Sequence, residues 1–72
     1  MYQFRADVDI NSLIDGRSIL YLAEKLYFNR DNLSKILKRG KPCSYIRAKA
    51  IVDYCKPNDN IEMYFVKLEK EG

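Results

Sequence analysis

Three segments of this sequence carry apolar residues at helical spacing, and each follows a residue type that commonly caps a helix. Ser18 precedes the first segment, Asn29 the second and Ser44 the third. Side chains of these types accept hydrogen bonds from the free backbone N–H groups at the start of a helix. The pattern predicts three short amphipathic helices in succession. A chain of 72 residues then has room for one small, mainly helical domain, residues 1–72.

The apolar stripes of these helices follow the 3.6-residue period. They consist of Ile19, Leu22, Ala23 and Leu26, then Leu33, Ile36 and Leu37, and then Ala48, Ile51, Val52 and Cys55. Gly40 suits the end of the second helix, and Pro57 ends the third because proline cannot continue the hydrogen-bond ladder. Only a short turn separates the first two helices, and Ala23 is small enough for them to cross closely. This pair predicts a helix-turn-helix.

The two ends of the chain predict a small sheet. Residues 2–8 alternate apolar and polar side chains, as in a strand with one buried face, and Asp9 suits the cap of a short helix that Gly16 closes. Residues 61–70 fit two patterns. A helix would place four apolar residues on one face: Ile61, Tyr64, Phe65 and Leu68. A strand would place three on one face: Tyr64, Val66 and Leu68.

A lone N-terminal strand would leave backbone groups unpaired. We therefore expect a short helical turn near Ile61, where Asp59 and Glu62 resemble a capping box, followed by a strand that pairs with residues 2–8. The predicted fold class is mainly helical. It has four to five short helices with a helix-turn-helix, and a small two-stranded antiparallel sheet formed by the N- and C-terminal segments.

The charge is concentrated in one third of the chain. Residues 30–49 contain seven Lys or Arg and one Asp, a net charge of +6, whereas the whole chain has a net charge of +3. The other 52 residues therefore carry −3. A positive segment on an otherwise acidic body attracts a polyanion to one face. Helical spacing leaves Arg30, Asp31, Asn32, Ser34, Lys35 and Lys38 on the outer face of the helix that follows Asn29.

The segment 22–42, LAEKLYFNRDNLSKILKRGKP, resembles the helix-turn-helix of the lambda-repressor-like family, of the Cro and CI type. The matching residues are Leu22, Ala23, Leu26, Leu33, Ser34, Ile36, Gly40 and Lys41. The N-terminal strand is similar to the Cro branch. The resemblance implies a sequence-specific DNA-binding transcriptional regulator, a repressor of phage or prophage type, that reads the major groove with helix 29–39.

Two positions depart from the family pattern. Tyr27 stands where the turn usually has glycine, so either it adopts a left-handed backbone at a cost of about 1 kcal/mol or the turn is reshaped. Ile19 stands at the first position of its helix, where the family often has a polar phosphate contact. We expect Arg17 and Ser18 to take that role from just upstream.

By this resemblance, base reading falls on Arg30, Asp31, Ser34 and Lys35. Asp31 has an equally good structural explanation, because an acidic side chain in the first turn interacts favourably with the helix dipole. Phosphate contacts are expected from Arg17, Ser18, Lys38, Arg39, Lys41, Ser44, Tyr45 and Arg47.

The expected partner is double-stranded DNA, bound by a homodimer, because one recognition helix buries too little surface for useful specificity. Tyr2, Phe4, Tyr64 and Phe65 are candidates for the dimer contact, although they equally suit the core. The alternative is a helix-turn-helix interaction module that binds an acidic protein partner, as an inhibitor or antirepressor would.

The composition argues against other classes. The chain has no His for acid–base catalysis near neutral pH, and two Cys without His are too few ligands for a zinc site, so we expect no enzyme, metal, cofactor or small-molecule substrate. Basic neighbours favour a lowered pKa for Cys43, but no base completes a dyad. No apolar run approaches membrane-spanning length, and the N-terminus lacks a signal-peptide layout, so a cytoplasmic protein with reduced cysteines is expected. Cys43 and Cys55 lie on either side of one helix. We interpret them as a small core residue and a spectator thiol, that is, one without a functional role.

Overall fold

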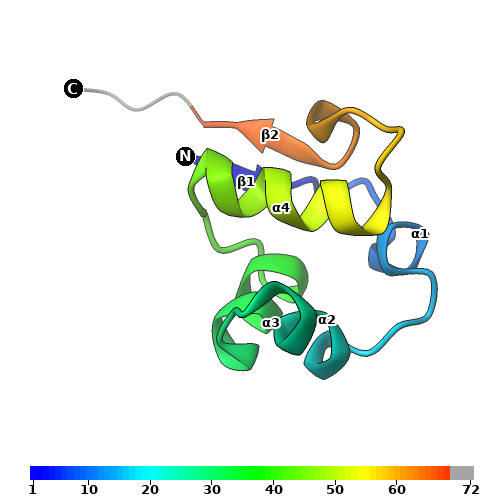
Figure 1. The fold of residues 1–72 in the computed structure, drawn as a ribbon. Helices are drawn as coiled ribbons and strands as arrows, with labels where there is room; N and C mark the ends of the chain where they lie inside the picture. Colours follow the sequence, from blue (N-terminus) through cyan, green and yellow to red (C-terminus); the bar gives the residue numbers. More distant parts are fainter. Residues whose placement is uncertain (69–72) are drawn as a thin grey trace.

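The computed structural model describes residues 1–68. In chain order these residues form β1 (Tyr2–Phe4), α1 (Ile10–Ile14), α2 (Ile19–Leu26), α3 (Arg30–Lys38), α4 (Tyr45–Cys55), the 3₁₀ turn η1 (Ile61–Met63) and β2 (Phe65–Lys67). The predicted fold class, mainly helical with a small antiparallel sheet from the two ends of the chain, is confirmed (Figure 1).

The caps predicted for the four α-helices are present. Ser18 accepts from the N–H of Tyr21, and Ser44 accepts from the N–H of Arg47. Asp9 caps α1 by accepting from the N–H of Asn11. These bonds satisfy backbone donors that a helix start otherwise leaves free, so each short helix begins at a defined residue.

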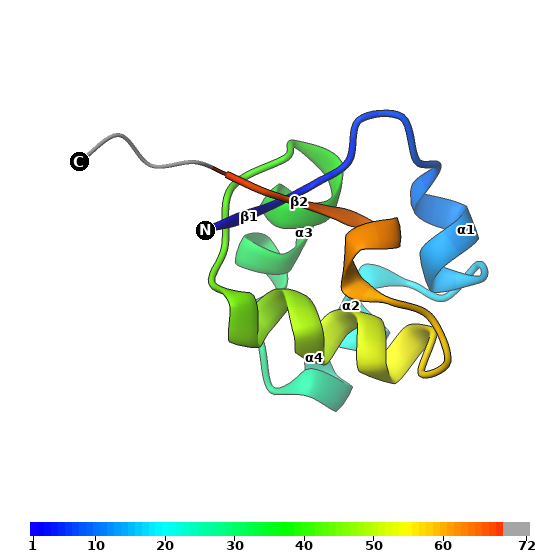
Figure 2. The same cartoon turned by 90° about the horizontal axis from the view of Figure 1, so that it is seen from above.

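The terminal strands pair as predicted, but over a shorter range. Tyr2 lies opposite Lys67 and Phe4 opposite Phe65 in an antiparallel register. The strand predicted over residues 2–8 stops at Phe4, because the chain turns at residues 6–7 to bring Asp9 to the start of α1. Figures 1 and 2 show β1 and β2 side by side, with α4 running alongside them.

The side of β2 that faces the core differs from the predicted alternation. Phe65 is 1% exposed and packs edge-on against Phe4 at 5.5 Å between ring centroids, whereas Val66 is 46% exposed. Each face of this strand carries one large apolar residue, so alternation alone does not decide which face is buried. Pairing with β1 places Phe65 over the core.

The predicted capping box at η1 is wrong. No side chain caps η1, and Asp59 instead accepts a hydrogen bond of 2.7 Å from the hydroxyl of Tyr64. This bond, together with burial, raises the pKa of Tyr64 to about 12. The contact ties the loop after α4 to the residue that precedes β2.

One core joins all of these elements. Its fully buried side chains include Leu13 from α1, Leu22 from α2, Leu33 from α3 and Ile51 from α4. Cys43 and Cys55 are both free and both buried, so not one but both of them are core residues. Cys43 also exchanges two backbone hydrogen bonds of 2.7 Å with Tyr2, which attaches the α3–α4 loop to the free edge of β1.

Candidate nucleic-acid interface

The outer face of α3 is polar and mostly basic, while its inner face is sealed. Leu33, Ile36 and Leu37 are between 0% and 4% exposed. Arg30, Asp31, Lys35 and Lys38 are exposed. Since one side of the helix is held in the core, the opposite side is presented to solvent in a fixed orientation.

Asn29 sets the start of this helix. Its side-chain oxygen accepts from the N–H groups of Asp31 at 2.9 Å and Asn32 at 3.2 Å. The cap fixes the residue at which α3 begins. Arg30 and Asp31, in the first turn of the helix, are both exposed.

The turn between α2 and α3 keeps a tyrosine where the resembled family has glycine. Tyr27 adopts a left-handed backbone, with φ 59° and ψ 38°, and its side chain is 95% exposed. The first of the two predicted outcomes is thus observed: the residue takes the strained conformation and the turn is not reshaped. Leu22 and Leu33, on either side of the turn, remain fully buried.

Three of the four predicted base-reading residues are freely exposed. The Nε of Arg30 lies 3.8 Å from a carboxylate oxygen of Asp31, so the acid lies within reach of the base as well as in the first turn of the helix. Lys35 is exposed one turn further along. Ser34 is only partly exposed, because it borders the buried side of α3, and this corrects its predicted place on the open face.

Three predicted phosphate-contact residues line one hollow beside α3. Lys41, Ser44 and Arg47 line a depression of about 340 Å³, and Asn32 of α3 lines it as well. The guanidinium of Arg47 lies 5.8 Å from the centre of the Phe28 ring, a cation–π contact that holds the side chain against the turn. The loop after α3 and the start of α4 thus extend the basic face of the helix.

Other predicted phosphate-contact residues occupy different settings. Lys38 and Arg39 are exposed at the C-terminal end of α3. Ser18 is the cap of α2, as Ser44 is of α4, so each hydroxyl already accepts one backbone hydrogen bond. Tyr45 is half exposed, and its ring packs against that of Tyr2 at 5.4 Å between centroids.

Arg17, which is predicted to contact phosphate, packs against Tyr54 of α4. It is partly buried, with its guanidinium carbon 5.6 Å from the centre of the Tyr54 ring, and its Nη1 is buried without a hydrogen-bond partner. Figure 1 places the α1–α2 connection on the opposite side of the view from the α3–α4 loop. The structure therefore separates Arg17 from the hollow that holds Lys41 and Arg47.

Asn32 and Phe28 border the basic face without having been named from sequence as base-reading or phosphate-contact residues. Asn32 lines the hollow, and Phe28 supports Arg47. Asn32 was recognisable as a polar residue on the outer face of its helix. No sequence signal pairs Phe28 with Arg47, because the two lie on different elements.

The candidate dimer contact is mostly internal. Phe4, Tyr64 and Phe65 are between 1% and 8% exposed, and Tyr2 is partly buried. These aromatic side chains fill the space between the terminal strands and the helices. A second copy of the chain cannot reach the first three without unfolding that region.

Neither cysteine has the environment of an activated thiol. Burial raises the pKa of Cys43 despite the nearby charge of Arg47, and burial likewise raises the pKa of Cys55. The lowered pKa expected for Cys43 is therefore wrong. Within residues 1–68, no group of three or more potential metal ligands occurs, and no helix is long and apolar enough to cross a bilayer.

Comparison with known proteins returned no relative: no protein-family model, no curated protein and no solved structure matches this chain.

Proposed function

We propose that this protein is a sequence-specific DNA-binding regulator of transcription that inserts α3 into the major groove. The observation that carries the proposal is the outer face of α3, where Arg30, Lys35 and Lys38 stand exposed on a helix whose other side is buried. A major groove about 12 Å wide admits one α-helix. A helix anchored along one side is suited to present its other side to base edges.

Base reading in this proposal belongs to the start and the middle of α3. Arg30 and Lys35 suit the O6 and N7 acceptors of guanine, and Asp31 suits the amino group of cytosine. The proximity of Asp31 to Arg30 also restricts the positions that the guanidinium samples. Ser34 is only partly exposed, so in this proposal it contacts the duplex at the edge of the major groove.

Phosphate binding belongs to the residues around the hollow and at the C-terminal end of α3. Lys41 and Arg47 supply charge beside the start of α4, whose free backbone N–H groups favour an anion. Lys38 and Arg39 supply charge at the other end of the face. In residues 1–68, no carboxylate lies within 4 Å of these four cations. They are therefore available to phosphates.

The proposal includes a homodimer that binds a two-fold operator, with half-sites about one helical turn apart. A single recognition helix buries too little surface for high specificity. The likeness of residues 22–42 to Cro and CI repressors supports a phage or prophage regulator acting in the bacterial cytoplasm.

The test begins with selection of bound sequences from a random duplex pool. On the selected site, Lys35→Ala is expected to relax preference at one or two base pairs, at about 1–3 kcal/mol of lost discrimination. Arg39→Ala is expected to weaken binding to all DNA sequences by the same factor. It should also reduce the slope of log affinity against log salt concentration by about 1. Fluorescence anisotropy at several salt concentrations measures both effects.

Lys67→Ala removes one exposed charge from β2, away from α3, and is the matched control. It is expected to leave both the affinity and the sequence preference close to those of the parent protein. Failure to bind any duplex at low salt would reject a DNA-binding role and favour a module that binds an acidic protein. Equal, sequence-independent losses in Lys35→Ala and Arg39→Ala would reject the assigned division between base and phosphate contacts.

A further inference from the structure

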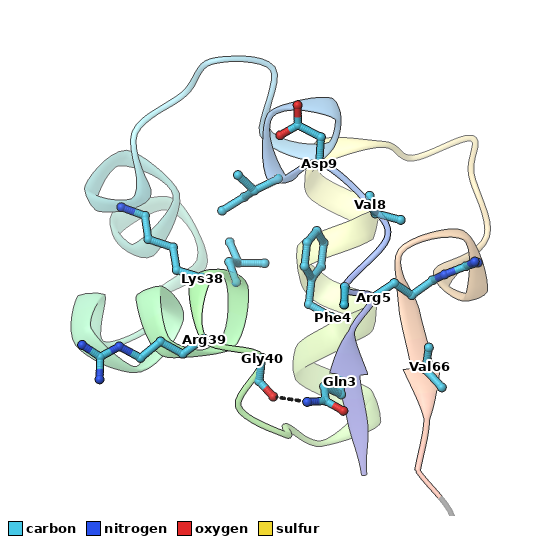
Figure 3. Close-up of a pocket in the computed structure, with 12 residues that line it drawn as sticks. Gln3, Phe4, Arg5, Val8, Asp9, Lys38, Arg39, Gly40 and Val66 are labelled. Atoms are coloured by element: carbon cyan, nitrogen blue, oxygen red, sulfur yellow. Dashed lines mark hydrogen bonds between the residues drawn. The ribbon is translucent and has the colours of Figure 1, made fainter.

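A second concave surface, which we call the terminal groove, lies between α3 and the N-terminal segment. It has a volume of about 800 Å³, and its apolar lining comes from Phe4, Val8, Ile10, Leu37 and Val66 (Figure 3). Phe4 and Leu37 are part of the buried core, while Val8 and Ile10 are partly buried against it. The floor is therefore a piece of the core that no element of the described chain covers.

One end of the terminal groove is held by a tertiary hydrogen bond. The side-chain amide of Gln3 donates to the carbonyl oxygen of Gly40 at 2.7 Å, which joins β1 to the end of α3 (Figure 3). Asp9, the cap of α1, lies toward the other end of the view. Because both walls are fixed to the core and to each other, the groove is present before any ligand binds.

Three bases and one acid, Asp9, line the terminal groove, so its charge is positive on balance. Arg5 is paired with Asp7 at 2.8 Å and also donates to the carbonyl oxygen of Glu62. Lys38 and Arg39, on the α3 side, are exposed and have no carboxylate within 4 Å among residues 1–68. Their aliphatic stems border the apolar floor, and Figure 3 shows their charged ends pointing outward from it.

This combination does not suit DNA or a small molecule. A phosphodiester backbone would lose its hydration over the apolar floor without a polar partner there. Small-molecule sites enclose most of the ligand surface, whereas this groove is widely open to solvent. A peptide segment satisfies both features, because its apolar side chains cover the floor while acidic side chains at its edge pair with the free cations.

We propose that the terminal groove is a docking site for a short acidic, amphipathic segment of a partner protein. Large apolar side chains of the segment pack over Val8, Ile10 and Val66. Its carboxylates lie along α3 and pair with Lys38 and Arg39. Val66, 46% exposed on β2, gains the most burial from such a partner.

Docking here has a consequence for the DNA-binding function, and this consequence alone rests on the function proposed above. Lys38 and Arg39 belong both to the groove and to the proposed phosphate contacts. The carboxylates of a bound segment and the phosphates of DNA cannot pair with these two cations at the same time. The partner therefore competes with DNA, so that an acidic protein would release the regulator from its operator.

The experiment selects binders from a display library of random 12-residue peptides against the intact protein without DNA. Enriched peptides are expected to combine at least two acidic with at least two large apolar residues. Fluorescence anisotropy of the labelled peptides then compares the parent protein with Val66→Glu and Val66→Gln, two side chains of matched size. We expect Val66→Glu to weaken binding at least tenfold and Val66→Gln by no more than threefold.

The double variant Lys38→Gln, Arg39→Gln is expected to weaken the peptide at least tenfold, whereas Lys67→Gln, outside the groove, leaves it unchanged. Enrichment of basic or uncharged peptides, absence of enrichment, or equal binding by both Val66 variants would overturn the proposal. A self-association that Val66→Glu abolishes in sedimentation would also overturn it, in favour of a second copy as occupant.

Peptide binding is measured without DNA, so its failure is separate from failure of the DNA-binding function. The competition step uses the selected duplex and titrates peptide against the complex. Peptide that binds the groove but does not displace DNA would reject the competition and leave the docking site standing.

Discussion

At the scale of single residues, Tyr27 is the position where local preference and tertiary demand disagree. Its left-handed backbone lets α3 leave α2 in the direction that buries Leu22 and Leu33. A non-glycine residue in this conformation costs roughly 1–2 kcal/mol. Since the side chain is 95% exposed, no packing within the described chain offsets that cost.

Tyr27→Gly is therefore expected to stabilise the protein. Relief of backbone strain exceeds the extra entropy that glycine gains in the unfolded chain, for a net gain of up to about 1 kcal/mol. For a domain of this size, 1 kcal/mol raises the melting temperature by about 4–8 °C. Tyr27→Ala keeps the strain and should not stabilise. Thermal unfolding followed by circular dichroism measures the melting temperatures of the variants. Equal melting temperatures for the Gly and Ala variants would reject backbone strain as the cause.

The same residue illustrates how much of the site is predictable. The sequence left two outcomes open at Tyr27, a left-handed backbone or a reshaped turn, and the structure shows that the first occurs. The exposure of Arg30 and Lys35 follows from helical period. The partial burial of Ser34 does not, because residues at the border of a stripe depend on what the neighbouring element covers.

At the scale of elements, the short helices depend on their caps. Helix α3 has nine residues, fewer than the about 12–15 that an isolated helix needs to persist in water. Its start is held by two hydrogen bonds to the side chain of Asn29. The orientation of the proposed recognition surface therefore rests on one amide group as well as on the buried stripe.

Asn29→Ala is expected to cost about 1 kcal/mol of unfolding free energy, because it leaves the N–H groups of Asp31 and Asn32 without their protein acceptor. Asn29→Asp retains an acceptor at the same position and should preserve stability. Urea denaturation of the three proteins measures the differences. A loss in Asn29→Asp as large as that in Asn29→Ala would show that the amide has a role other than capping.

At the scale of the whole molecule, the ends of the chain close the core. β2 contributes Phe65, one of the largest fully buried side chains, and pairs with β1 at the opposite end of the sequence. A 72-residue domain has about 4–11 kcal/mol of total stability at 0.05–0.15 kcal/mol per residue. A single side chain at this closure can therefore hold a large share of it.

Phe65→Ala is expected to destabilise the protein by about 3–5 kcal/mol, through lost burial and the cavity left beside Phe4. Val66→Thr, on the exposed side of the same strand, keeps the β-branched shape and should change stability by about 0.5 kcal/mol or less. Urea unfolding at 25 °C compares the two. Similar losses in both variants would contradict the assignment of Phe65 to the core and Val66 to the surface.

Sequence alone determined the helices, their caps, the basic third of the chain and the pairing of the two ends. Each of these depends on residue type and on a spacing of a few positions, which local geometry converts directly into structure. The tertiary structure decided which neighbours meet. It placed Arg17 on Tyr54, turned Phe65 rather than Val66 inward, and gathered Lys41, Ser44 and Arg47 around one hollow. These outcomes depend on contacts between elements distant in the chain, and periodicity within one element carries no information about them.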